Sequence, residues 1–167
     1  MFYLMFDFMK IIARVLICLI SVVLWSCGSS AGSDPAPTPQ PTVAQLISKS
    51  WSASTVSWDG VAQYSKGATT NLVSGYSQFK LDLTSTTAAS LTEFDGRKFT
   101  GTYTLSTDNK KITLNGLTSS EGAPSGTNGT LEFNIVGTPS ASALSLETTT
   151  TYIKASNKKV SLSLVNP

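Results

Sequence analysis

The side chains that carry most enzyme chemistry are scarce in this chain. It has no histidine and only two cysteines, Cys18 and Cys27, both near the N-terminus. A serine or cysteine nucleophile needs a neighbouring base, most often histidine, and zinc sites are commonly built from cysteine and histidine. No glycine loop ending in Lys-Ser or Lys-Thr follows a predicted strand, which excludes a P-loop. We therefore expect no metal and no cofactor.

Paired carboxylates are the remaining route to acid–base hydrolysis. Asp82 and Glu132 alternate with apolar residues in strand-like segments and are expected to face solvent. Asp95 lies in the turn signal "FDG", where aspartate bonds its own backbone. Glu93 shares its parity with Leu91 and can point inward, although a strand-end carboxylate in water is the simpler interpretation. We expect a protein that is not an enzyme.

Aromatic residues gather near the ends of the predicted strands. Together with Glu93, the candidate ligand-binding residues are Trp51, Trp58, Tyr76 and Tyr103. An exposed aromatic platform could stack on a sugar ring. The alternative is that Trp51 closes one end of the fold and Tyr103 belongs to the core, because aromatic side chains dominate core energetics through their area.

The charge of the chain is nearly balanced. Twelve Lys and Arg stand against ten Asp and Glu, and the basic residues form no cluster larger than the pairs Lys110-Lys111 and Lys158-Lys159. Nucleic-acid binding needs a basic stripe that releases counterions from phosphates. We expect no nucleic-acid partner.

The N-terminal segment has the pattern of a secretory signal peptide. Lys10 and Arg14 precede a short apolar run over 15–25, whereas a membrane-spanning helix needs about 20 apolar residues. We expect residues 1–26 to be the signal peptide. Translation is expected to start at Met9, which places the positive charges near the terminus.

Cys27 lies where the sequence changes from apolar to small and polar. The stretch "LWSC" (24–27) resembles the lipobox of bacterial lipoproteins, in which the cysteine is acylated; Trp25 is larger than usual at its position. The alternatives are a lone cysteine after an ordinary signal, or a transmembrane anchor that ends at Trp25. Because two or three acyl chains give stable membrane residence, we expect lipidated Cys27 to be the membrane anchor.

Residues 27–42 form a Pro-, Ser- and Gly-rich linker. Such composition favours an extended polyproline spacer, and a disordered tail without a spacing role would have the same composition. Both interpretations place one folded domain after it, at 43–167.

That domain alternates apolar and polar residues with period two. In "QFKLDLT", Phe79, Leu81 and Leu83 share one face, as expected for half-buried antiparallel strands. One short helix is expected within 42–50, with Thr42 as its N-cap. Eight strands are expected near 51–58, 76–84, 88–94, 99–106, 111–116, 130–137, 143–152 and 159–165.

Short connections between successive strands predict an all-β, eight-stranded antiparallel up-and-down barrel. The stretches "LISKSWSAS", "FDG" and "FTGTYTLSTDNKKITLNG" resemble the small lipocalin-like lipoproteins of Bacteroidetes-type bacteria. The resemblance covers residues 43–167 and implies a lipocalin-like barrel. That family has no common ligand or reaction, so the resemblance assigns no functional residue.

These observations lead us to expect a membrane-anchored, non-catalytic lipoprotein that binds a small apolar or amphipathic molecule, or a partner protein, in the cell envelope. The alternatives are a structural or surface-interaction lipoprotein with a fully packed barrel, or a glycan-binding module. A cavity of several hundred cubic ångströms would favour ligand binding. Bacteroidetes-type lipoproteins that are sent to the cell surface usually resemble one another in an acidic run just after the cysteine, and no such run follows Cys27. The resemblance therefore implies the periplasmic face of the outer membrane rather than the cell surface.

Overall fold

A computed structural model describes residues 39–166, which fold mainly into β-strands with little helix. The predicted signal peptide (1–26), Met9, Cys27 and most of the linker lie outside the described residues. The strands are β1 (Ser50–Trp58), β2 (Val61–Ser65), β3 (Lys80–Asp82), β4 (Ala88–Thr92), β5 (Lys98–Leu105), β6 (Lys111–Thr118), β7 (Leu131–Ile135), β8 (Ala143–Thr148) and β9 (Val160–Val165). The helices are α2 (Val43–Ile47) and the 3-10 helices η2 (Ser74–Gln78) and η3 (Ile153–Ala155).

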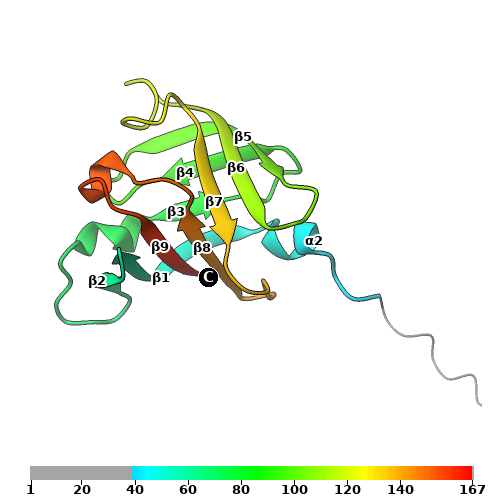
Figure 1. Cartoon of the computed structure of the whole chain (residues 1–167), viewed down its shortest axis with the longest axis horizontal. Coiled ribbons are helices and arrows are strands. Elements are labelled where there is room, and N and C mark those ends of the chain that lie inside the picture. The colour runs from blue at the N-terminus through cyan, green and yellow to red at the C-terminus, as the bar shows by residue number, and fades with distance from the viewer. Residues whose placement is uncertain (1–38, 167) are drawn as a thin grey trace, which may run out of the picture. The chain divides into compact units, whose positions relative to one another are not determined.

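Eight of these strands form a closed antiparallel barrel (Figure 1). From β3 to β9, each strand pairs with the next one along the chain. β1 pairs with both β3 and β9 and so joins the two ends of the sheet. Closure removes the exposed sheet edges that would otherwise invite aggregation. The predicted all-β barrel is thereby confirmed.

Alternation along the strands decides which side chains enter the barrel. Leu81 on β3 lies opposite Leu91 on β4, which in turn lies opposite Phe99 on β5. All three are at most 2% exposed, whereas Lys80 and Thr100 point outward and are exposed. Full burial of each such Leu or Phe contributes about 1.5–3 kcal/mol to stability. The apolar rows across neighbouring strands therefore form the core.

Helix α2 covers one end of the barrel. The Gln45 backbone N–H donates to the Thr42 hydroxyl (3.3 Å), and the Thr42 N–H donates to the Gln45 side chain (2.8 Å), which is a capping box. The predicted N-cap at Thr42 is confirmed, although the helix ends at Ile47 because the chain enters β1 three residues later. Ile47 is fully buried, and its carbonyl accepts a hydrogen bond from the Trp51 indole at 2.9 Å.

β2 lies outside the ring, and the sequence pattern did not predict it. β2 pairs with Thr55–Trp58 of β1. The earlier residues Ser50–Ser52 on the same edge of β1 pair with β3. The loop that follows β2 covers its outer edge, because the Asn71 side chain accepts from the Ser65 N–H (2.7 Å) and donates to the Ser65 carbonyl (3.3 Å). Covering an edge in this way protects a strand from pairing with another chain.

Two predicted strands are wrong over part of their length. Within 76–84, residues up to Gln78 belong to η2, and only β3 pairs with its neighbours. The predicted strand over 143–152 ends at Thr148, and η3 follows. In both places the chain crosses the end of the barrel, before β3 and after β8. Residues that cross the end cannot pair with a neighbouring strand.

These two helical turns lie toward the same end of the barrel, away from α2 (green and orange in Figure 1). η2 packs directly on the turn between β4 and β5, where a β-carbon on Gly75 would overlap the backbone carbonyl of Phe94. The helical turns η2 and η3, which are not part of the sheet, therefore close this end of the barrel.

Candidate functional site

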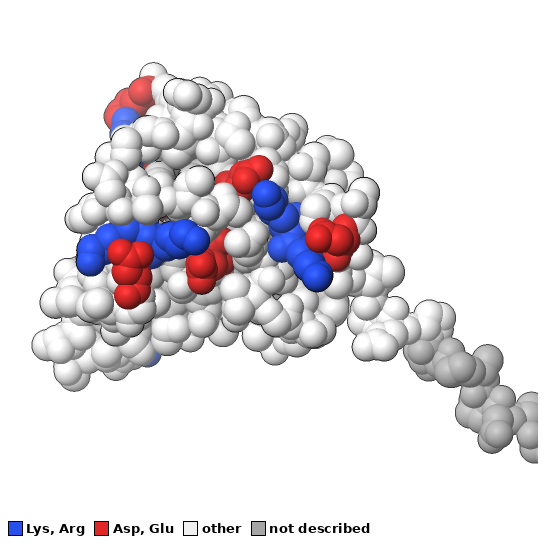
Figure 2. Space-filling view, viewed as in Figure 1, with Lys and Arg blue, Asp and Glu red and all other residues white. Residues whose placement is uncertain are grey.

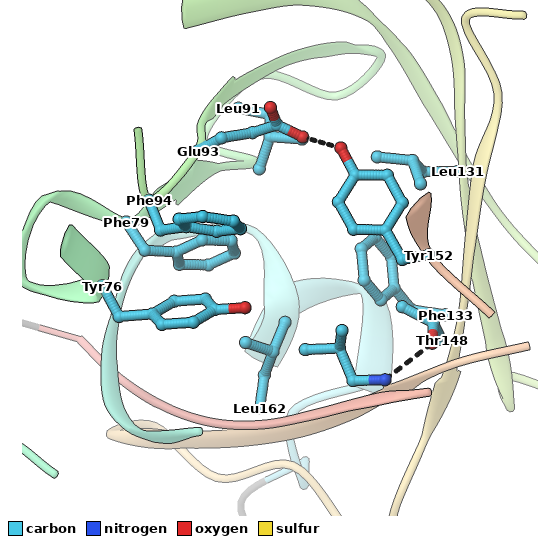
Figure 3. Close-up of a pocket in the computed structure, with 11 residues that line it drawn as sticks. Tyr76, Phe79, Leu91, Glu93, Phe94, Leu131, Phe133, Thr148, Tyr152 and Leu162 are labelled. Carbon is cyan, nitrogen blue, oxygen red and sulfur yellow. Dashed lines mark hydrogen bonds between the residues drawn. The ribbon is translucent and has the colours of Figure 1, made fainter. Parts of the chain in front are cut away.

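A small cavity lies inside the barrel beneath η2 and η3 (Figure 3). Aromatic and aliphatic side chains such as Phe79, Phe133 and Leu162 form most of its lining, and Tyr76 and Glu93 add polar groups. Its volume is about 30 Å³, about a tenth of the smallest usual ligand pocket. In this form the barrel is essentially filled by its own side chains.

Glu93 is the central polar residue of this end of the barrel. It is only 3% exposed, so the expectation that its carboxylate lies in water at the end of a strand is wrong. Glu93 is buried like Leu91, two residues earlier, with which it was predicted to share a face. The Tyr152 hydroxyl donates a hydrogen bond to one carboxylate oxygen (Figure 3), and the Lys154 ammonium pairs with the other. A buried carboxylate needs such donors, because an unpaired buried charge is strongly unfavourable.

Lys154 joins Glu93 to a second carboxylate. Its ammonium lies 2.7 Å from Asp95 Oδ2 and 5.8 Å from the centroid of the Phe99 ring. Burial lowers the pKa of Lys154, but the hydrogen bonds to Asp95 and Glu93 and their negative charges outweigh burial and raise it. Lys154 therefore stays protonated and acts as a fixed cation.

Asp95 has two roles in the same turn. Its Oδ1 accepts from the Arg97 backbone N–H at 3.1 Å, as expected of a turn aspartate, while its other oxygen meets Lys154. Burial raises the pKa of Asp95, but the bonds from Lys154 and Arg97 and their positive charges lower it further than burial raises it. The carboxylate is consequently held in its charged form.

The two tyrosines near Glu93 are both kept neutral. Burial raises the pKa of Tyr76 to about 12; the hydrogen bond from Trp58 opposes this shift and the charge of Glu93 adds to it. Burial, the hydrogen bond to Glu93 and the charges of Glu93 and Asp95 raise the pKa of Tyr152 well above its ordinary value. Both phenols therefore serve as hydrogen-bond groups at neutral pH.

Three of the sequence-predicted site residues come together here, namely Trp58, Tyr76 and Glu93. The Trp58 indole donates to the Tyr76 hydroxyl at 2.9 Å, and Tyr76 packs on Phe94 with ring centroids 4.8 Å apart. The Trp58 and Phe94 rings are inclined at 54°, so they form no flat platform for a sugar. Within residues 39–166 the large exposed apolar side chains are aliphatic: Val61, Leu72, Val136 and Ile153.

Trp51 and Tyr103 lie away from this cluster. Trp51 is fully buried beside α2, and Tyr103 is half-buried with its hydroxyl donating to the Ser85 carbonyl at 3.0 Å. Sequence reasoning did not identify Tyr152 and Lys154, because Tyr152 was interpreted as the last residue of a strand over 143–152 and Lys154 lay in the connection to the next predicted strand. The one signal that could have found them is the loss of alternation after Thr148, in "TTTYIKAS".

Glu93, Asp95 and Lys154 are held in fixed ion pairs, and none of them is an activated nucleophile. A catalytic lysine usually has a lowered pKa, whereas that of Lys154 is raised. In the part of the chain that the structure describes, no three acidic or metal-ligating side chains are grouped so that they could hold a metal ion.

A wider hollow of about 520 Å³ lies along β1, β8 and β9 and also reaches Ala62, Tyr64 and Ser65 on β2. Across these strands, Ser57 lies opposite Ser161, which lies opposite Glu147. Each of the three strands is paired on both sides, so a molecule on this face would contact side chains. On the face shown in Figure 2, cationic and anionic side chains lie beside one another without a continuous patch of either sign.

Among residues 39–166, no helix has the length and apolar character that crossing a membrane requires. Comparisons with protein-family models, curated proteins and solved structures found no match to this chain.

Proposed function

We propose that this protein is a non-catalytic lipoprotein of the cell envelope, anchored to the membrane through acylated Cys27, with a packed barrel that acts through its outer surface on a partner. The lipobox-like "LWSC" and the Pro-rich linker support the anchor. The face of the outer membrane that looks into the periplasm is the proposed location.

The cavity volume carries the choice of a packed barrel. Ligand pockets usually enclose about 300–1,000 Å³, whereas the interior here leaves about 30 Å³. A protein that binds its partner through the outer surface of the barrel needs no larger interior cavity. The hydroxyl-rich outer hollow over β1, β8 and β9 is large enough to receive part of a partner.

Native mass spectrometry of the protein extracted from its own membranes tests this proposal. The expected mass is that of the acylated chain alone. A stoichiometric small-molecule adduct that disappears on denaturation would overturn the packed-scaffold proposal, whereas a bound partner protein agrees with it.

The location has a separate test. Proteinase K added to intact cells should leave the protein whole, since the outer membrane shields a periplasmic domain. Rapid loss of the protein while a periplasmic control survives would place it on the cell surface.

A second candidate function, binding of a small amphipathic molecule, is favoured by one specific observation. Tyr76 and Glu93 direct buried polar groups toward a mainly apolar cavity, which Thr148 and Tyr152 also line. An apolar pocket with a few convergent polar groups is the usual form of a small-molecule site. This function requires the closed end of the barrel to open.

A further inference from the structure

The Lys154 ammonium lies in a site built by other parts of the chain. Glu93 and Asp95 each place a carboxylate oxygen on it, and the Phe99 ring lies 5.8 Å away. Glu93 is 3% exposed and is held by the Tyr152 hydroxyl. Paired carboxylates and an aromatic face are groups that recognise an ammonium ion. We call Glu93, Asp95 and Phe99 the ammonium site.

The charge of this site selects the kind of molecule that can occupy it. Two carboxylates face one lysine ammonium. Arg97, whose charge also reaches Asp95, is itself paired with Glu121. A carboxylate or phosphate would add to the excess negative charge, whereas an ammonium can take the place of the one already present.

Lys154 is carried by a segment that lies outside the barrel ladder. Residues 149–159 connect β8 to β9 and contain η3 and one isolated bridge, between Tyr152 and Lys158. Ser156 and Asn157 both have left-handed backbone conformations, with φ of 55° and 58°. Backbone strain of this kind gathers at ligand clamps and switch segments. The two ends of the segment are held, because the Thr149 N–H donates to the Glu132 carbonyl on β7 and the Lys159 carbonyl accepts from the Asp59 N–H, both at 3.0 Å. The residues between these bonds, 150–158, can move away without breaking the eight-stranded ring.

The same segment covers the interior cavity. Tyr152 forms part of the cavity lining together with Glu93. The Tyr76 hydroxyl also points into the cavity (Figure 3); it is 2% exposed, and within residues 39–166 its one hydrogen bond is the one it accepts from Trp58. Withdrawal of the segment would connect the ammonium site to an apolar interior with a free hydroxyl donor.

We propose that Glu93, Asp95 and Phe99 form a binding site for a primary alkylammonium group, which Lys154 fills in the closed form. When 150–158 moves aside, the ammonium of the ligand takes the place of Lys154 and its apolar chain enters the barrel beside Phe79 and Leu162. This inference rests on the second candidate function and names its ligand class.

Three probes with the same chain test the proposal on the folded wild-type domain, namely octylamine, octanoate and octanol. In amide NMR titrations at neutral pH, octylamine should give saturable shifts within 93–99 and 149–159. Octanoate and octanol should bind at least about tenfold more weakly, a difference of about 1.4 kcal/mol. The Trp58 signal should change as well, because its partner Tyr76 lies at the cavity.

A variant that vacates the site sharpens the test. Lys154→Ala should bind octylamine at least about tenfold more tightly than wild type, because no resident cation competes. Lys159→Ala is the matched control, since it removes the same charge from an outer pair with Glu147 at 3.9 Å. Adding Glu93→Gln to Lys154→Ala should remove the gain. If the vacated variants do not fold, the wild-type titration decides alone.

The proposal is overturned if wild type binds no octylamine saturably, if octanoate or octanol binds as tightly, or if the shifts map to the outer strands. Such a result leaves the anchored, packed-scaffold proposal standing when native mass spectrometry shows a ligand-free chain. Conversely, octylamine binding together with a membrane-derived adduct supports the ammonium site and overturns the packed scaffold.

Discussion

Gly75 lies directly against the backbone of Phe94. A β-carbon on Gly75 would overlap the Phe94 carbonyl oxygen. Because this oxygen belongs to the backbone of a tight turn, it cannot rotate away as a flexible side chain would. The absence of a side chain at Gly75 therefore lets η2 seat on the turn after β4, and that contact brings Tyr76 over the barrel interior.

Gly75→Ala should lower the free energy of unfolding by about 1–3 kcal/mol, as overpacking commonly does. Urea unfolding of the domain measures the change. Ser74→Ala is the control, since Ser74 is the exposed neighbour on the same turn and should leave stability nearly unchanged. Equal midpoints for Gly75→Ala and wild type would contradict the close packing of η2 on Phe94.

Lys154→Met should lower the free energy of unfolding by about 3–5 kcal/mol, because it leaves the buried Glu93 carboxylate without its cation. Lys111→Met is the matched control: its pair with Glu132 is about 40% exposed on both sides and should contribute less than about 1 kcal/mol. Urea midpoints compare the two. The double variant Glu93→Leu with Lys154→Met should regain stability, and a loss as large as that of the single variant would argue against a buried ion pair.

Alkaline titration should show Tyr76 ionising late. Its pKa is raised from 10.0 to about 12 in the folded protein, so the folded state binds more protons than the unfolded state between these values. The contribution of Tyr76 to stability is therefore fully present below pH 10 and is lost as pH rises through 12. Tyrosinate absorbance of wild type and Tyr76→Phe measures this, and an identical late titration in both proteins would refute the assignment.

Asn71→Ala should increase self-association, because it frees the Ser65 N–H and carbonyl on the outer edge of β2. Analytical ultracentrifugation at increasing concentration measures the effect. Asn134→Ala, an exposed asparagine on a strand paired on both sides, is the control. A monomeric Asn71→Ala protein at all concentrations would show that the loop protects the edge without this side chain.

Cys27→Ser should abolish membrane association while leaving the barrel folded, since acyl chains on Cys27 provide the proposed anchor. Membrane fractionation and incorporation of radiolabelled palmitate are the measurements, and Cys18→Ser is the matched control within the apolar run over 15–25. Equal palmitate incorporation in Cys27→Ser and wild type would refute lipidation at Cys27.

The barrel could be predicted because its signal is local. Side chains alternate across a strand with period two, so the spacing of Phe79, Leu81 and Leu83 alone indicates which face is buried, and all three are buried. The N-cap at Thr42 is a local signal of the same kind. The spacing of two residues between Leu91 and Glu93 likewise indicated that Glu93 can point inward, although a position in solvent was the simpler interpretation.

Only the tertiary structure decided what surrounds Glu93. Tyr152 and Lys154 lie 59 and 61 residues farther along the chain, in a segment whose sequence shows no periodic pattern. They reach Glu93 because closing the ring places the connection between β8 and β9 over the same barrel end as the turn after β4. Alternation indicates which side chains of a strand face the interior. It carries no information about which loops, distant in the sequence, lie at the same end of the barrel. The volume left inside the barrel depends in the same way on how η2 and η3 pack over it, since side-chain volumes alone do not determine where the chain crosses the opening.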